Sequence, residues 1–109
     1  MNPLRTIVAL ACCLLLAACA RQASPTSDRE RRIAAAEAEV NRMDATLANL
    51  STESQPDCAR VCSLVTNICG LAQRICELAA DESVLHARCR DAGVRCDHAR
   101  ASAARCACR

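Results

Sequence analysis

Residues 58 to 79 read CARVCSLVTNICGLAQRICELA, and the phrase I-C-x-L-A occurs in them twice, seven residues apart. One stripe of residues in this stretch alternates steps of four and three: Cys58, Cys62, Val65, Cys69, Ala72, Cys76 and Ala79. A second stripe with the same steps carries larger aliphatic side chains: Val61, Leu64, Ile68, Leu71, Ile75 and Leu78. This period is typical of an α-helix. Two adjacent stripes therefore predict a helix over about 57–80 that is buried over a wide arc.

The chain after residue 80 continues the same period. Its stripe is Leu85, Cys89, Ala92, Cys96, Ala99, Ala103 and Cys106. A turn at 80–83 separates the two stretches, and Asp81 is the expected N-cap of the later helix. Residues 57–109 are therefore predicted to form a cysteine-rich antiparallel helical hairpin.

Cysteines that face each other across such a hairpin have position numbers that add to a nearly constant value. Cys76 with Cys89 and Cys69 with Cys96 meet this condition. The alanines between these pairs are small enough to bring the two backbones within disulfide reach. The stripes therefore predict two disulfides, Cys76–Cys89 and Cys69–Cys96.

The open end of the hairpin holds four more cysteines, and their pairing stays open. A Cys58–Cys106 bond fits the register but leaves Cys62 and Cys108 out of step. A nested set, Cys62–Cys106 with Cys58–Cys108, requires a shift or a frayed helix end. The even number of eight cysteines leaves no free thiol in either arrangement.

A third helix is expected before the hairpin, over residues 28–50. Ser27 and Glu30 form a capping-box pattern at its start. Its heptad seam is Ile33, Ala36, Val40, Met43, Leu47 and Leu50. The seam either folds back onto the aliphatic stripe of 57–80, giving a three-helix bundle, or self-associates as a coiled coil. Folding back is favoured because the stripe is otherwise uncovered, but residues 33–50 remain a candidate surface for a protein partner or a homo-oligomer.

The first nineteen residues have the layout of an export signal. A short basic segment, residues 1–5, precedes a thirteen-residue apolar run, TIVALACCLLLAA, which is too short to span a bilayer. The run ends in Leu16-Ala17-Ala18-Cys19, which resembles the lipobox of bacterial lipoproteins at every position. The resemblance implies cleavage after a signal peptide of residues 1–18 and acylation of Cys19. Residues 19–27 would then form the lipid attachment and a flexible tether, with RQASPTS (residues 21–27) as its polar part.

The residue after the lipobox cysteine bears on the final compartment. Ala20, and not Asp, follows Cys19. In enterobacterial lipoproteins this pattern resembles export to the outer membrane, facing the periplasm. The expected location is therefore the cell envelope, with the outer membrane favoured over the inner.

Composition limits the classes of function. The 109 residues include 11 Cys and no aromatic side chain, and the 14 basic residues, all Arg, nearly balance 12 acidic ones. Without a basic run or an aromatic to stack a base, a nucleic-acid partner is not expected. The sequence shows no activated nucleophile, carboxylate pair or phosphate-binding loop, so neither an enzymatic activity nor a cofactor is expected. A small core without aromatics predicts covalent staples instead.

Two resemblances remain for the chain as a whole. The lipobox and the I-C-x-L-A-x-R-I-C phrase resemble small Cys- and Arg-rich lipoproteins of high-GC Gram-negative bacteria, which implies a structural or partner-binding role at the membrane. The cysteine-lined helices are also similar in composition to bacterial copper-storage four-helix bundles. That likeness implies Cu(I) or Zn on the same eight cysteines, from Cys58 to Cys108. Of these cysteines, however, only Cys58 and Cys62 lie one helical turn apart within a helix, the spacing that such a site needs.

Overall fold

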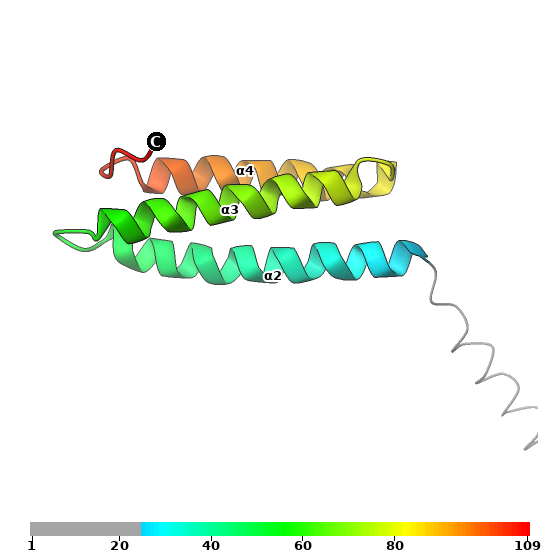
Figure 1. The fold of residues 1–109 in the computed structure, drawn as a ribbon, viewed down its shortest axis with the longest axis horizontal. Coiled ribbons are helices and arrows are strands. Elements are labelled where there is room, and N and C mark those ends of the chain that lie inside the picture. The colour runs from blue at the N-terminus through cyan, green and yellow to red at the C-terminus, as the bar shows by residue number, and fades with distance from the viewer. Residues whose placement is uncertain (1–24) are drawn as a thin grey trace, which may run out of the picture.

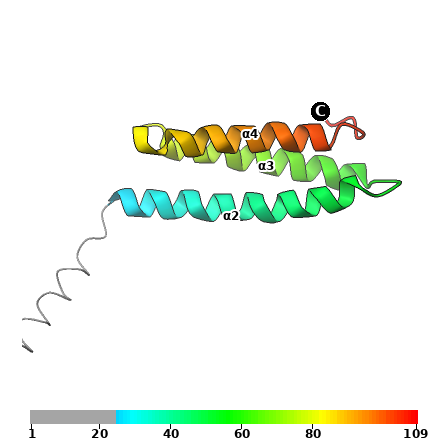
Figure 2. The same cartoon turned by 180° about the vertical axis from the view of Figure 1, so that it is seen from behind.

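The computed structural model describes the backbone of residues 25–109 and the side chains from residue 28 onward. The predicted signal peptide, Cys19 and most of the predicted tether lie outside the described residues. Three α-helices and one short 3-10 turn make up the fold: α2 (Pro25–Ser51), α3 (Cys58–Ala79), η1 (Ser83–Leu85) and α4 (His86–Ser102). These described residues contain no strand, which confirms the all-α class. The helices lie side by side, and α3 runs antiparallel to both α2 and α4 (Figures 1 and 2).

Helix α2 begins at Pro25, three residues before the expected start at Asp28. Proline suits the first turn of a helix because its fixed φ is helical and its missing N–H has no partner there in any case. Residues 25–27 therefore belong to the helix and not to the tether, and Ser27 is not at the N-cap position.

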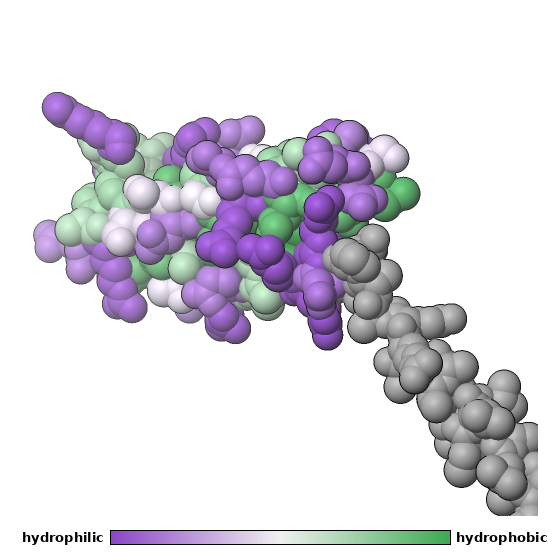
Figure 3. Space-filling model, turned by 45° about the vertical axis from the view of Figure 1, so that its right-hand side comes forward, coloured by the Kyte–Doolittle hydropathy of each residue, from purple (hydrophilic) through white to green (hydrophobic). Residues whose placement is uncertain are grey.

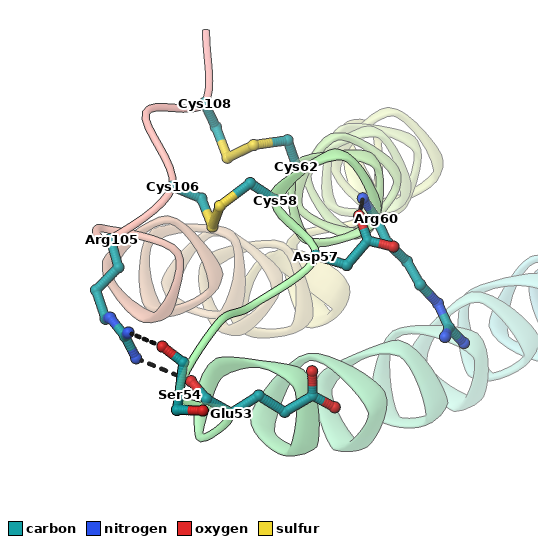
Figure 4. Close-up of a disulfide and its surroundings, with 9 residues drawn as sticks. All are labelled: Glu53, Ser54, Asp57, Cys58, Arg60, Cys62, Arg105, Cys106 and Cys108. Atoms are coloured by element: carbon teal, nitrogen blue, oxygen red, sulfur yellow. Dashed lines mark hydrogen bonds between the residues drawn. A yellow bond between two sulfur atoms is a disulfide. The ribbon is translucent and has the colours of Figure 1, made fainter.

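Helix α3 begins where the sequence predicts. Asp57 has an extended backbone and its side-chain oxygen accepts a hydrogen bond from the Arg60 N–H at 3.2 Å (Figure 4). This bond satisfies one of the backbone donors that a helix start leaves unpaired. Pro56, one residue earlier, disfavours any helical continuation from the preceding loop.

The turn between α3 and α4 differs from the prediction. Asp81 is not an N-cap; the chain instead enters α4 through the 3-10 turn η1, which starts after Glu82. Backbone hydrogen bonds close this turn, from the Glu82 N–H to the Ala79 carbonyl and from the Leu85 N–H to the Glu82 carbonyl. The tight turn lets Leu85 reach the core, where only 3% of its surface stays exposed.

The most buried line of α3 runs along the border between its two predicted stripes. Its members come from the stripes in turn: Val61, Val65, Ile68, Ala72, Ile75 and Ala79. Cys62, Cys69 and Cys76 are half-buried on one side of this line, and Leu64, Leu71 and Leu78 on the other. A helix packed between two neighbours buries the middle of a wide apolar arc. The cysteines consequently lie at the edge of the core, facing α4.

The predicted faces of the outer helices also point inward. On α2 the seam residues Ile33, Val40 and Leu47 are at most 2% exposed, and Met43 is half-buried. These side chains pack in two clusters with residues of α3 and α4. The apolar face of residues 33–50 is therefore used within the chain.

The fully buried Ile68 offers a test of this core. Replacing Ile68 with Ala is expected to lower the free energy of unfolding by about 3 kcal/mol, because lost apolar contacts and a cavity add together. The matched control is Val94→Ala on α4, where Val94 is 66% exposed and the change should stay within about 0.5 kcal/mol. Guanidinium unfolding with the disulfides intact measures both. Equal losses at the two positions would contradict the core described above.

Two glycines lie inside helices at positions where packing does not require the absence of a side chain. A Cβ added to Gly70 or to Gly93 would meet no atom within 4 Å. Alanine at either position is therefore expected to raise the free energy of unfolding by about 0.5–1 kcal/mol, since glycine is the weaker helix former. Thermal unfolding of the single variants checks this, and a loss of stability at either site would show that the bare backbone is needed.

Candidate functional site

Four disulfides join α3 to α4 and to the segment that follows it. The structure bonds Cys76 to Cys89 and Cys69 to Cys96, as the register of the stripes predicts. Their Cα atoms are 4.5 Å and 4.7 Å apart. Each Cα lies about 2.3 Å from its helix axis, so these distances require the bonded positions of the two helices to face each other directly, and the small side chains between the rungs allow this along the contact.

Alanines provide that close approach. Ala72 of α3 and Ala92 of α4 are about 5% exposed or less, and they lie between the two rungs. Ala79 and Ala99 are fully buried. With only a methyl group at each of these positions, the two backbones can meet at disulfide distance over most of the hairpin.

At the open end, Cys58 bonds to Cys106 and Cys62 bonds to Cys108 (Figure 4). The pairing that fits the helical register is thus present, and the nested set is not. Helix α4 ends at Ser102, and the chain then reverses, so the later cysteine of α3 pairs with the later cysteine of the segment. The segment 106–108 therefore runs in the same direction as α3.

The C-x-C spacing carried a signal for this reversal. Two residues that are two positions apart lie on different faces of an α-helix. Cys106 and Cys108 could both reach α3 only if the helix ended before them. Backbone bonds from the Ala104 N–H to the Ala101 carbonyl, and from the Cys106 N–H to the Ala103 carbonyl, form the turn.

A second ladder, made of arginines, joins α4 to α2. Arg88 donates two hydrogen bonds to Glu37, from Nε to Oε1 at 2.8 Å and from Nη2 to Oε2 at 2.5 Å. Arg95 lies 3.3 Å from Asp44 Oδ2. Arg105 donates to the Ser54 carbonyl at 3.0 Å, and also to the Glu53 carbonyl at 3.1 Å (Figure 4).

The arginine ladder has a constant register. Arg88 with Glu37 and Arg95 with Asp44 are both separated by 51 positions, and Arg105, beyond α4, bonds to the loop after α2 at nearly the same separation. A constant difference is the mark of two parallel elements, as a constant sum is of two antiparallel ones. The sequence analysis did not predict this ladder. The usable signal was the shared spacing of seven between Arg88 and Arg95 and between Glu37 and Asp44.

The Arg88–Glu37 pair shifts the titration of both groups. The hydrogen bonds from Arg88, with the positive charges of Arg88 and Arg95, hold the pKa of Glu37 below its ordinary value, although partial burial opposes the shift. The same hydrogen bonds raise the pKa of Arg88. The folded protein therefore favours the charged form of this pair.

The eight cysteines stand as disulfides here, and a disulfide sulfur is not the thiolate that binds Cu(I) or Zn. Among residues 25–109, no three or more His, Cys, Asp or Glu side chains are grouped so as to hold a metal ion. Over the same residues, no helix combines the length and the apolar character that crossing a membrane requires.

No protein-family model, curated protein or solved structure matches this chain. Its function is therefore inferred from its own residues.

Acid titration tests the Arg88–Glu37 contact. Because the folded-state pKa of Glu37 is lowered, its stabilising contribution is present above the unfolded-state pKa and is lost as pH falls through the folded-state value. Between about pH 6 and pH 3 the native chain should lose more stability than a Glu37→Gln variant does. The difference should be below about 1 kcal/mol, since the pair is about one-third exposed.

An Arg88→Gln variant and the double variant complete this cycle. Removing Arg88 should abolish the same part of the pH dependence of stability. The double variant should show the same pH dependence as either single variant. Chemical unfolding across the pH series is the measurement. The same acid loss in the native chain and in Glu37→Gln would contradict the contact.

Proposed function

We propose that the protein is a non-catalytic lipoprotein of the bacterial cell envelope, anchored through acylated Cys19 and facing the periplasm from the outer membrane. The observation that carries the proposal is the presence of a full lipobox and of four disulfides in the same short chain. The folded unit is a disulfide-laddered helical bundle, and its role is structural or partner-binding.

The two features support each other because they depend on the same compartment. Disulfides persist outside the reducing cytosol, in compartments such as the periplasm. A lipobox belongs to chains that are exported before they are acylated. The basic segment 1–5 and the apolar run before Cys19 have the lengths of a signal peptide.

The length of the tether sets where the folded unit works. Only five residues, 20–24, separate Cys19 from the start of α2 at Pro25. Even fully extended, this linker reaches about 20 Å. Two or three acyl chains form a stable anchor. The helices would therefore remain close to the lipid surface, with the start of α2 nearest to it.

A partner would meet polar surface. The apolar seam of residues 33–50 packs against α3 and α4 within the chain, which supports a polar contact surface over that seam. Among the described residues, Val84 and Val94 are the exposed large apolar side chains. Figure 3 shows hydrophilic side chains spread over much of the face that it draws. Arginine-rich outer surfaces, including Arg60 and Arg74 of α3, are the candidate contacts.

Lipid attachment is the first test. Mass spectrometry of the mature protein is expected to find a chain that begins at Cys19 and carries acyl groups, recovered with the membrane fraction. A Cys19→Ser variant should lose acylation and membrane association. Cys13→Ser is the matched control, because Cys13 lies in the apolar run and should not affect processing. An unacylated chain cut at another position would overturn the proposal.

The same preparation tests the alternative of thiolate metal binding. Protein alkylated directly in the envelope, with metal analysis alongside, is expected to carry Cys58 to Cys108 as disulfides and no stoichiometric metal. Eight reactive thiols with bound copper or zinc would instead establish a Cu(I)- or Zn-binding protein.

A further inference from the structure

The Cys62–Cys108 disulfide is held differently from the other three. The two inner disulfides, Cys69–Cys96 and Cys76–Cys89, each join a residue within α3 to a residue within α4. Cys106 lies beyond α4 but is buried in the core, with 4% of its surface exposed. Cys62 and Cys108 are half-buried, as Cys76 and Cys89 are, but Cys108 lies in a non-helical segment beyond α4. In Figure 4 their bond lies outside the Cys58–Cys106 bond, away from α2.

Little else holds the chain beyond Cys106. The preceding residues are anchored, since Arg105 donates to the loop after α2 and the Cys106 N–H to the Ala103 carbonyl. The Cys108 N–H bonds only to the Cys106 carbonyl, within the segment itself. Among the hydrogen bonds of the described residues, none joins residues 107–109 to a helix. The disulfide is the connection that fixes Cys108 against α3.

An open hollow of about 480 Å³ lies beside this bond. Cys108 lines it together with Cys69 and Cys106 of two other disulfides, and Arg100 and Arg109 contribute two cationic side chains. Of these three cysteines, Cys108 is the one in the segment without hydrogen bonds to a helix. Positive charge near a sulfur favours thiolate over thiol, both for an incoming nucleophile and for a departing one. The hollow therefore offers an approach to Cys108 in a setting that supports thiolate chemistry.

The consequence of breaking the bond also differs. If a helix-to-helix rung such as Cys76–Cys89 is reduced, core packing keeps the two thiols facing each other, and this high effective concentration favours re-closure. Cys108 can move away once it is released. The neighbouring Cys58–Cys106 bond still joins the same two ends, so little additional chain freedom is gained. This rung can open while the fold persists.

We propose that the Cys62–Cys108 disulfide is a thiol–disulfide exchange site that accepts two electrons from a dithiol, while the other three disulfides remain closed. A thiolate of the dithiol forms a bond to Cys108 Sγ, the Cys62–Cys108 bond breaks, and its electron pair leaves on Cys62 Sγ, which takes up a proton. The second thiolate of the dithiol then attacks the dithiol-derived sulfur of the mixed disulfide and releases the Cys108 thiolate, which takes up a proton. The dithiol ends as a disulfide, and Cys62 and Cys108 end as thiols.

The exchange changes the shape of the open end. Residues 107–109 lose their covalent connection to α3, and the hollow that Cys108 lines widens on that side. This site goes beyond an anchoring or structural role and does not depend on whether Cys19 carries lipid. Its reversal by a disulfide partner restores the closed form.

Stepwise reduction tests the proposal. The folded protein is titrated with dithiothreitol, a small dithiol, then acid-quenched and alkylated, and the labelled cysteines are mapped by mass spectrometry. The expected first product carries two labels, on Cys62 and Cys108, and retains its helical circular dichroism. First labels on Cys76 and Cys89, or a direct transition from no label to eight, would overturn the proposal.

Paired variants separate the site from general stability. Cys62→Ser with Cys108→Ser should remove the early step while helicity and thermal unfolding stay close to those of the native chain. The matched control, Cys76→Ser with Cys89→Ser, should retain the early step at Cys62 and Cys108. Loss of the fold in the first double variant, or loss of the early step in the control, would show that the four rungs act as one unit.

A single variant tests which sulfur is attacked. Cys62→Ser leaves Cys108 as a free thiol beside Arg109, and oxidised glutathione should form a mixed disulfide with it rapidly. The converse variant, Cys108→Ser, leaves Cys62 on the helix and should react at least several-fold more slowly. Equal rates would overturn the assignment of Cys108 as the entry point.

Discussion

The close approach of α3 and α4 is the constraint on which the structure depends. Disulfides require their Cα atoms within about 4.4–6.8 Å, and two packed helices keep facing positions this close along several turns where small side chains line the contact. Ala72 and Ala92 provide such a contact between rungs. Once one inner rung fixes the register, the other inner rung and Cys58–Cys106 follow from the helical spacing, whereas Cys62–Cys108 depends on the chain reversal after Ser102. A chain without aromatic side chains thus obtains from covalent geometry the order that larger residues would otherwise supply.

The three helix pairs are joined by different chemistry. Disulfides connect α3 to α4, arginine contacts connect α4 to α2, and the contact of α2 with α3 is chiefly apolar. Helix α4 carries both ladders, with Arg88 next to Cys89 and Arg95 next to Cys96. One heptad repeat therefore serves two neighbours, because adjacent positions on a helix point about 100° apart. The heptad repeat of α4 therefore fixes how α2 and α3 are aligned along its axis.

Periodicity predicted the elements that depend on apolar spacing. The buried faces of α2, α3 and α4, the two inner rungs and the approximate start of α3 all follow from local patterns of steps. The start of α2, the turn after α3 and the reversal after Ser102 do not follow, because each depends on backbone bonds and tertiary contacts that outweigh local preference. The arginine ladder could not be predicted because charged residues at heptad spacing are equally typical of a solvent-exposed helix face. Only the position of α2 beside α4 distinguishes paired charges from solvated ones.

Helix α2 contains no cysteine, so no covalent bond ties it laterally to the hairpin. It is also the helix that lies nearest to Cys19 in the chain. Tension applied at Pro25 would therefore act on side-chain packing and on contacts such as Arg88–Glu37, which yield at forces far below those that break sulfur–sulfur bonds. Under load α2 would peel from its N-terminal end, while the hairpin kept its shape. The molecule is mechanically two parts: a compliant N-terminal helix and a rigid, disulfide-linked hairpin.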